Sequence, residues 1–515
     1  MSEGTKQFGK LRTFFWPIHR FELKKFLPML CIFFLLSFDY NVLRCMKDTI
    51  VITSQDAGAE VIPFIKAWVM FPMSVTLTYV FIRLSNRFSR ERVFYIMLSI
   101  FLGYFFLFAL FLYPARESLH AYSSAETLRN LLPAGFKGFV AMYKYWIYTS
   151  FYVMAELWSN IVLFLLFWGF ANQVTKIDEA KRFYGLFGLG TNFSGIASGQ
   201  ISIFISQLPF NPSNPFGNDA WSQSMTMLIG LVLLAGIITM VLFRYVNKTV
   251  ATEELIQNRD CLNQKQEKKK FSMRENIRYV LTSSYVLAIA LIVIAYNLVI
   301  NLVEVMWKNE VNQLYPNPQD YNIFMNEITT VIGILATLMA IFVSGNCIRK
   351  YGWTFTALLT PIVLLVTSIG FFGFFFLKDS PHIVTHLIGV TPLTLVVFFG
   401  SMQNCFSRAC KYTVFDATKE MTFVPLSADA KIKSKAAVDG VCNRLGKSSG
   451  SALYNVLLPI FASISACAPI VAVVLFITIT LWIISVRFLG KKFNALSAPE
   501  KPTSTQAPVT ASVAA

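Results

Sequence analysis

The sequence predicts an all-α membrane protein with twelve transmembrane helices arranged as two halves of six. Three observations support this prediction. The 515-residue chain is 55% hydrophobic and only 14% charged, whereas soluble domains carry about 25% charged residues. Apolar stretches long enough to cross a bilayer recur along the chain. One long charged link near the middle separates two equal sets of these stretches.

Each apolar stretch is long enough to cross a hydrocarbon core about 30 Å thick, and a helix is the only open-ended element that satisfies its own backbone there. The fourth stretch is longer than one perpendicular span needs, so we expect it to be tilted or to begin in the interface. In chain order the stretches are 26–45, 61–82, 93–113, 139–173, 181–206, 221–246, 279–306, 322–346, 352–377, 385–411, 437–461 and 466–489.

The charged link divides the chain into domains. Two six-helix halves on either side of such a link are the layout of the major facilitator architecture, whose halves move against each other around a site at the membrane midplane. Helix count and link position support this major-facilitator-like prediction, because the halves show no convincing sequence repeat. The predicted parts are an N-terminal segment (1–25), the halves (26–246 and 279–489), the basic linker (247–278) and a disordered tail (490–515).

The basic residues are distributed unevenly between the two sides of the predicted helices. They gather in the N-terminal segment, in the linker, and after the second, fourth and tenth helices. Because cytoplasmic loops attract Lys and Arg, we expect both termini to be cytoplasmic. The net charge of +17 is then explained by topology, and nucleic acid is not expected as a partner. No transit or cleavable signal pattern is evident, which favours a bacterial inner membrane. The main basic residues expected in the opposite loops are Lys66, Arg116, Arg129, Lys137 and Lys378.

Glu156, Glu304 and Lys447 each lie in the middle of an apolar stretch. An ionised side chain at bilayer depth costs roughly 2.5–3.5 kcal/mol on insertion scales. We therefore expect these three to face the protein interior and to mark a substrate path. For any one of them, structural pairing without ligand contact remains an alternative.

Other polar residues share helix faces with these charges, at the spacing expected for an α-helix. Those near helix ends, namely Arg44, Lys308, Arg408 and Lys411, fit equally well with side chains that reach the membrane interface. Whether Arg408 and Lys411 line the path is left open. By helix, the stripes are Arg44, Lys47 and Asp48 in the first; Tyr148, Tyr152, Glu156 and Asn160 in the fourth; Asn297, Asn301, Glu304 and Lys308 in the seventh; Asn404, Ser407, Arg408 and Lys411 in the tenth; and Arg444, Lys447, Ser448, Ser451 and Asn455 in the eleventh.

The balance of these charges indicates an anionic substrate. Arg44, Lys47, Arg444 and Lys447 together exceed what two glutamates neutralise. Such a site suits a phosphate-bearing ligand, since Arg offers a fork of donors and Lys a point charge. Trp146, Tyr148 and Tyr152 could stack on a base, although packing is the commoner role of such residues.

Nothing in the sequence calls for a cofactor or a metal. The eight cysteines are scattered without a Cys-x-x-Cys pair and are interpreted as packing residues. Gly446-Lys447-Ser448 is not a phosphate-binding loop, because Val441 stands where that motif needs glycine. The glycines from 185 to 199 indicate close helix packing. A membrane transferase acting on phosphorylated lipids is the rival class, and an ion channel is disfavoured. We expect a transporter and not an enzyme.

Several long motifs resemble the nucleotide transporter (ATP/ADP translocase) family of obligate intracellular bacteria and plant plastids. The resemblance extends from about residue 8 to 490. It implies a twelve-helix transporter whose functionally important charges fall on Lys47, Glu156, Glu304 and Lys447. The motifs are LRCMKDT (43–49), IPFIK (62–66), AELWSNIVLFLLFWGFANQVTKIDEAKRFYGLFGLGTN (155–192), NLVEVMWK (301–308) and FDATKEMTFVPLSADAKIKSKAAVDGVCNRLGKSSGS (415–451).

The resemblance implies nucleotides as partners alongside the lipid bilayer, with ATP/ADP exchange as the leading function. Cys45-Met46, Ser449 and Asp-Ala-Gly at 56–58 depart from the usual exchangers. These departures keep open a proton-coupled import of nucleoside triphosphates with other bases, such as UTP, CTP or GTP. Base preference, coupling ion and oligomeric state are not determined by the sequence.

Overall fold

The computed structural model describes residues 16, 18–55, 57–175, 177–251, 273–342, 344–378 and 389–497. These residues form helices joined by short turns and loops, and no strand occurs among them. The predicted all-α class is therefore confirmed. Most of the predicted linker and tail, and the first fifteen residues, lie outside the described residues.

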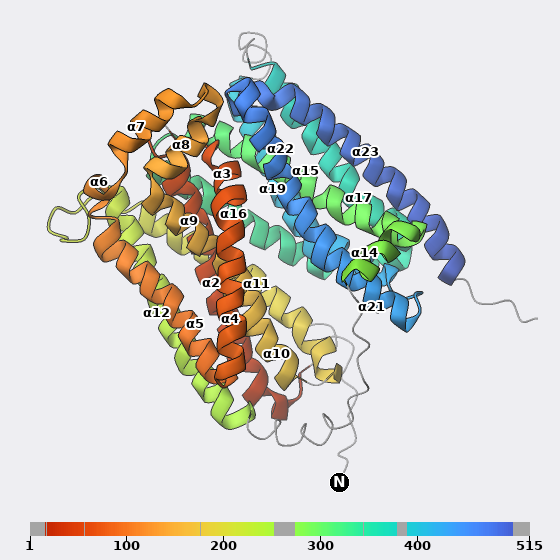
Figure 1. Cartoon of the computed structure of the whole chain (residues 1–515). Coiled ribbons are helices and arrows are strands. Elements are labelled where there is room, and N and C mark those ends of the chain that lie inside the picture. Colours follow the sequence, from red (N-terminus) through yellow and green to blue (C-terminus); the bar gives the residue numbers. More distant parts are fainter. Residues whose placement is uncertain are drawn as a thin grey trace, which may run out of the picture.

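The N-terminal half occupies the left of Figure 1 and is built from six long helical segments with short helices between them. Several of these segments contain π-helical turns. In chain order the elements are η1 (Arg20–Glu22), α2 (Leu23–Ile52), α3 (Val61–Phe64), η2 (Ile65–Met70), α4 (Phe71–Arg87), α5 (Arg90–Leu107), η3 (Phe108–Leu112), α6 (Arg116–Leu119), α7 (Tyr122–Leu131), η4 (Ala134–Phe136), α8 (Lys137–Lys144), α9 (Trp146–Trp158), η5 (Ser159–Trp168), α10 (Gly169–Val174), α11 (Ile177–Ser206), α12 (Ala220–Val246) and η6 (Asn247–Ala251).

The C-terminal half lies on the right of Figure 1, with α23 along its outer edge. Side-chain caps begin two of its long helices: Ser283 accepts a hydrogen bond from the backbone of Val286, and Thr391 from that of Thr394, as helix N-termini require. The elements are α14 (Met273–Thr282), α15 (Ser284–Leu314), α16 (Pro318–Phe342), α17 (Ser344–Phe376), α19 (Pro392–Cys410), η7 (Lys411–Phe415), α20 (Asp416–Thr422), α21 (Ala428–Ala437), η8 (Val438–Cys442), α22 (Asn443–Phe461) and α23 (Ile464–Ser497).

Nine of the helices in the described ranges are long and apolar enough to cross a membrane by length and composition. The remaining long helices, α11, α19 and α22, coincide with the fifth, tenth and eleventh predicted stretches. Polar or charged residues interrupt the apolar sequence of each of these three helices. The fourth stretch is divided at Tyr145, whose backbone leaves the helical region. Its first part forms the separate helix α8, and the span itself runs from Trp146 to Val174.

Several helix pairs join the halves, α2 with α16 among them, and two junctions bring glycine against backbone. α11 crosses α16 so closely that a Cβ on Gly199 would lie 2.2 Å from the Thr330 hydroxyl, and one on Gly333 would lie 2.7 Å from the Asn192 carbonyl. Small residues allow this approach, as in other membrane helix pairs. The prediction that the glycines near 199 serve packing is confirmed for Gly199, whereas Gly185 and Gly188 have no neighbour within contact distance.

The second pair brings α22 against α3, η2 and η4. A Cβ on Gly135 in η4 would lie 2.1 Å from the carbonyl of Leu458, so backbone meets backbone there. α4, which continues from η2, packs instead on α5. The halves are therefore joined at the end that holds η4 and the last turn of α22. Their ribbons diverge toward the opposite end, where α2 begins (Figure 1).

Candidate functional site

Six charged side chains form a continuous series of ion pairs between the halves. They come from α2, α9, α15 and α19. The series begins with Glu156 and Lys47, whose Oε2 and Nζ are 3.2 Å apart, and Lys47 also contacts Asp48 at 3.0 Å. Beyond Asp48 the members are Lys308 at 2.9 Å from its carboxylate, Glu304 at 3.0 Å from Lys308, and Arg408 at 3.1 Å from Glu304.

The ion pair of Asp48 and Lys308 connects the two halves. Asp48 lies on α2 and Lys308 on α15, and their side chains are 1% and 3% exposed. Removal of one partner would leave the other with one buried partner in place of two, Lys47 for Asp48 or Glu304 for Lys308, and breaking a buried pair costs up to about 3–5 kcal/mol. The pair therefore stabilises the conformation in which the halves meet at this point.

Two predicted residues thus flank the pair of Asp48 and Lys308 that joins the halves. Lys47 contacts Asp48, and Glu304 contacts Lys308. The ammonium group of Lys47 also lies 3.9 Å from the centre of the Tyr152 ring. This cation–π contact and the burial of Tyr152 leave that ring no free face to stack on a base. The possibility that Lys308 and Arg408 extend to the membrane interface is excluded, because both are paired inward.

Four further basic residues lie beside this series without a carboxylate at salt-bridge distance in the described part of the chain: Arg44, Lys66, Arg444 and Lys447. Their charges reach the same acids. Arg44 interacts with Glu304 and Asp48, and Lys66 and Lys447 both interact with Glu156. Because the six-member series contains three acids and three bases, these four residues are a positive surplus.

Sequence reasoning misplaced Lys66. It was expected in a loop on the less basic side, but it lies in η2, inside a membrane span. Its ammonium group donates a hydrogen bond to the Asn301 side-chain oxygen at 3.3 Å, from the N-terminal half to the C-terminal half. The available signal was the IPFIK motif (62–66), which belongs to the family resemblance and ends at this lysine.

The polar stripe on α22 divides into two parts. Arg444, Lys447 and Ser448 are exposed, whereas Ser451 is buried. A Cβ added to Gly446 would lie 2.9 Å from the Cβ of Asn297 on α15, and one added to Gly450 would lie 2.8 Å from the Cβ of Asn301. At the joined end, Asn455 donates a hydrogen bond to the carbonyl of Pro63 on α3. The helix thus holds Lys447 on an open face while its neighbours fix the position of the backbone.

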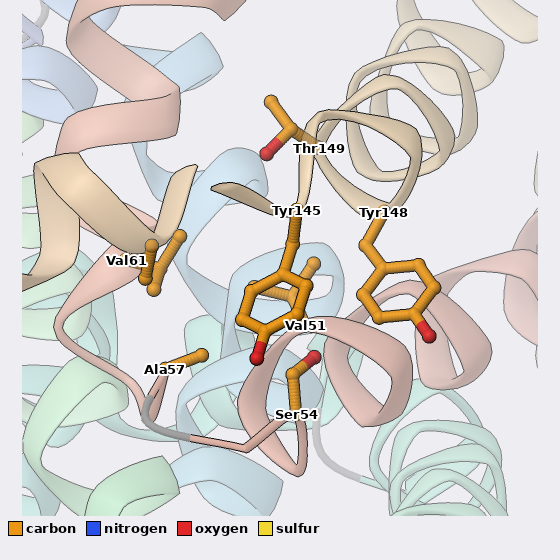
Figure 2. Close-up of a pocket in the computed structure, with 8 residues that line it drawn as sticks. Val51, Ser54, Ala57, Val61, Tyr145, Tyr148 and Thr149 are labelled. Atoms are coloured by element: carbon orange, nitrogen blue, oxygen red, sulfur yellow. The ribbon is translucent and has the colours of Figure 1, made fainter. Parts of the chain in front are cut away.

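Trp146 and Tyr148 do not belong to this site. Tyr148 packs edge-on against His120 and stacks on Tyr145, and the Trp146 indole donates a hydrogen bond to the Leu119 carbonyl. Tyr145 and Tyr148 also line the pocket in Figure 2. Its other lining residues are Val51, Ser54, Ala57, Val61, Ala141 and Thr149. None of the described residues that line this pocket is charged, and its lining therefore offers no counter-charge to an anion.

The described residues contain no group of His, Cys, Asp and Glu side chains that could hold a metal ion. The paired and surplus charges make electrostatic binding the chemistry that the site offers. Fixed donors from several helices can hold a multiply charged anion between the halves, and the paired acids keep the basic side chains in place.

Comparison with known proteins places this arrangement among carriers. A family model described as "TLC ATP/ADP transporter" matches residues 1–493. ADP,ATP carrier protein 1 of Chlamydia trachomatis is 44% identical over 96% of this chain and 94% of its own length. ADP,ATP carrier protein 2 of Chlamydia pneumoniae is 43% identical over 98% of this chain and 96% of its own length. A chloroplastic ADP,ATP carrier protein 1 of Arabidopsis thaliana is 37% identical over 93% of this chain and 75% of its own length.

Solved structures agree on the fold. A bacterial homologue of the iron transporter ferroportin, in an inward-facing state, matches with a TM-score of 0.52 and 10% identity, over 94% of this chain and all of that one. A D-xylose–proton symporter matches with a TM-score of 0.50 and 12% identity, over 92% and 97%. At such identities the likeness concerns the fold, and it confirms the predicted major-facilitator-like architecture.

Proposed function

Because the chain belongs to the TLC ATP/ADP transporter family, we propose that it exchanges ATP for ADP across a membrane. Support comes from bacterial and plastid relatives named as ADP,ATP carriers at 37–44% identity over most of the chain. The relatives are carriers and not enzymes, so the rival interpretation as a lipid transferase is set aside.

The positive surplus beside the ion-pair series is the observation that carries the proposed mechanism. Lys447 and Arg444 are exposed on α22, so they are the first basic groups that an entering phosphate chain would meet. Arg44 and Lys66 lie closer to the series and would hold phosphates that reach farther in. Lys and Arg in these positions form charge-assisted hydrogen bonds with phosphate oxygens.

Lys47, Glu156 and Glu304 have a different role in this proposal. They are already paired, so they hold the basic groups at fixed positions and compete with the substrate for them. A bound phosphate would draw Lys47 or Lys308 away from its carboxylate. The pair of Asp48 and Lys308 that joins the halves would then weaken when substrate is present.

The same charges account for exchange. When the site is empty, four positive groups lack a counter-anion, and closing the halves around them would bury unpaired charge at high cost. A nucleotide removes that penalty in either direction of transport. The carrier therefore returns only when it is loaded, which is what an obligatory exchange of two nucleotides requires.

For location, we propose a bacterial inner membrane with both termini in the cytoplasm. The basic loops support this orientation through the positive-inside rule. The end at which the two halves diverge holds the start of α2 and therefore faces the cytoplasm in this orientation. Helix α21 would lie on the same side.

The proposal is tested by uptake of labelled ATP into proteoliposomes that contain ADP, no nucleotide, or AMP. We expect rapid uptake with internal ADP and at least a tenfold lower rate in empty vesicles. Uptake that is equal in empty vesicles and is abolished by an uncoupler would contradict exchange and indicate proton-coupled import. Parallel assays with GTP, CTP and UTP give the base preference.

A further inference from the structure

Asp39 is a buried carboxyl group that the proposed mechanism does not use. It lies on α2 between Leu36 and Val42, which are also buried, and its exposure is 0%. Neither of its oxygens has a hydrogen-bond partner, and it belongs to no ion pair among the described residues. A charged residue within a membrane span normally has a partner or a function, and Asp39 lacks the first.

The surroundings of Asp39 contain no compensating charge. The only influence on its carboxyl group from the described residues is burial itself. Around it, α2 packs on α9, η5, α11, α12, α15 and α16. The titratable groups on these elements are Tyr148, Tyr152 and Glu156 (α9); Asp178, Glu179, Lys181, Arg182 and Tyr184 (α11); Arg244 and Tyr245 (α12); Tyr285, Tyr296, Glu304, Lys308 and Glu310 (α15); and Asp320, Tyr321 and Glu327 (α16), with none on η5.

The acids and bases of the ion-pair series, which lie on α2, α9 and α15 among other helices, are engaged with one another. Glu156 pairs with Lys47, and Lys308 pairs with both Asp48 and Glu304. On α2 itself, Tyr40 and Arg44 are the nearest titratable neighbours in sequence. An ionised carboxylate in this setting would be both desolvated and unpaired, so the neutral acid is the form that the structure accommodates.

We propose that Asp39 is a proton-binding site that works together with the nucleotide site. It holds a proton in this conformation and loses it to water when the halves rearrange. One O–H bond breaks as water on one side of the membrane takes the proton, and an O–H bond forms again with a proton from water on the other side. This inference rests on the proposed ATP/ADP exchange, since ATP carries one more negative charge than ADP and one carboxyl group can compensate for one charge.

The position of Asp39 on α2 connects the two sites. Lys47 lies eight residues farther along the same helix, which corresponds to about 12 Å along its axis. Any shift of α2 that accompanies the weakening of the pair between Asp48 and Lys308 therefore also moves Asp39 relative to α9 and α12. Exposure of the carboxyl group to water would follow the same movement that exchanges the nucleotide.

The test uses proteoliposomes that contain ADP and a trapped pH-sensitive dye, with the membrane potential clamped by potassium and valinomycin. For the wild type we expect proton movement with each ATP taken up, and an exchange rate that depends on pH. In Asp39→Asn the amide mimics the neutral acid. Exchange should continue, while the ratio of protons to nucleotides falls at least tenfold and the pH dependence is lost.

Thr239→Val is the matched control, because Thr239 is also fully buried on α12 with an unpartnered oxygen but cannot titrate in this range. It should keep the wild-type ratio. Proton movement in Asp39→Asn equal to that of the wild type would overturn the inference. Exchange by the wild type without any proton movement would also overturn the inference. This second outcome does not depend on whether the Asp39→Asn variant folds. Wild-type protein that takes up no ATP would overturn the proposed function, and this inference with it.

Discussion

At the scale of residues, Lys447 gives the most direct test of phosphate binding. It is exposed and has no salt-bridge partner in the described part of the chain, so its removal should not disturb packing. We expect Lys447→Ala to lower ATP uptake by two orders of magnitude or more while the melting temperature stays close to that of the wild type. Uptake in proteoliposomes and a thermal melt in detergent measure the two quantities.

Lys491→Ala serves as the matched control, since Lys491 is another exposed lysine but lies near the end of α23, away from the ion-pair series. It should transport normally. Near-normal uptake by Lys447→Ala would remove this residue from the site, whereas an equal loss in both variants would indicate a general effect of surface charge.

His120 predicts how stability depends on pH. Its ring is buried against Tyr145 and Tyr148, and neither nitrogen has a hydrogen-bond partner. Burial lowers the pKa of His120 from 6.5 to about 4, with Arg116 and Lys144 acting in the same direction. Between these values the unfolded state binds more protons than the folded state, so stability falls as the pH falls through this window.

We therefore expect the melting temperature to fall between pH 6.5 and about pH 4, and His120→Phe to reduce that part of the loss. The aromatic substitute keeps the ring contacts and cannot be protonated. Thermal melts of both proteins across the range provide the measurement, and identical pH profiles would contradict the assignment.

Sequence reasoning identified part of the site for a clear physical reason. Lys47, Glu156 and Glu304 are charges in apolar surroundings or in a recognisable motif, and the structure brings all three into one series. Asp48 and Lys308 lie near predicted helix ends, where a charge has a simpler explanation, so their pairing was not predicted. It depends on how α2 meets α15, which no local pattern encodes. Lys66 was missed because it was counted with the loop residues, although it falls within the second predicted stretch (61–82).

At the scale of elements, the ion pair of Asp48 and Lys308 links α2 to α15. Asp48→Asn or Lys308→Met alone should destabilise the protein, by up to roughly 3–5 kcal/mol, because the charge that remains keeps one buried partner, Glu304 or Lys47, in place of two. The double variant should recover much of that loss. A double-mutant cycle on thermal or denaturant unfolding measures the coupling, and additive effects of the two substitutions would show that the pair does not hold the helices together.

The crossing of α11 and α16 depends on the absence of a side chain at Gly199. A methyl group there would meet the Thr330 hydroxyl and the Asn326 carbonyl, so Gly199→Ala should lower the melting temperature and slow exchange. Gly188→Ala, in the same helix but without a neighbour within contact distance, should be neutral or slightly stabilising, because alanine favours helix over glycine. Equal melting temperatures for the two variants would contradict this account of the crossing.

Element positions followed from apolar length, since a span needs about 20 residues. Irregularities within the elements did not. The π-helical turns of η2 and η5 and the break at Tyr145 are not marked by any change in hydropathy. Hydropathy reports how much of a segment is apolar and contains no information about one inserted residue.

At the scale of the whole molecule, the halves meet at one end through α11 with α16 and α22 with α3 and η4, and the ribbons diverge at the other. The ion-pair series lies between them with a positive surplus on one side. In the proposed mechanism, the surplus charge gives the carrier a reason not to rearrange without an anion. The sequence predicted two halves of six helices, but it could not show at which end they meet.

The most direct test of this coupling between loading and rearrangement is a distance measurement between spin labels at Ser89 and Ser427, which are exposed on opposite halves near the diverging end. Without nucleotide we predict one long distance. ATP or ADP should add a second, shorter distance, and Lys447→Ala should show only the long one under all conditions. A mixture of both distances that is equally populated with and without nucleotide would contradict the account.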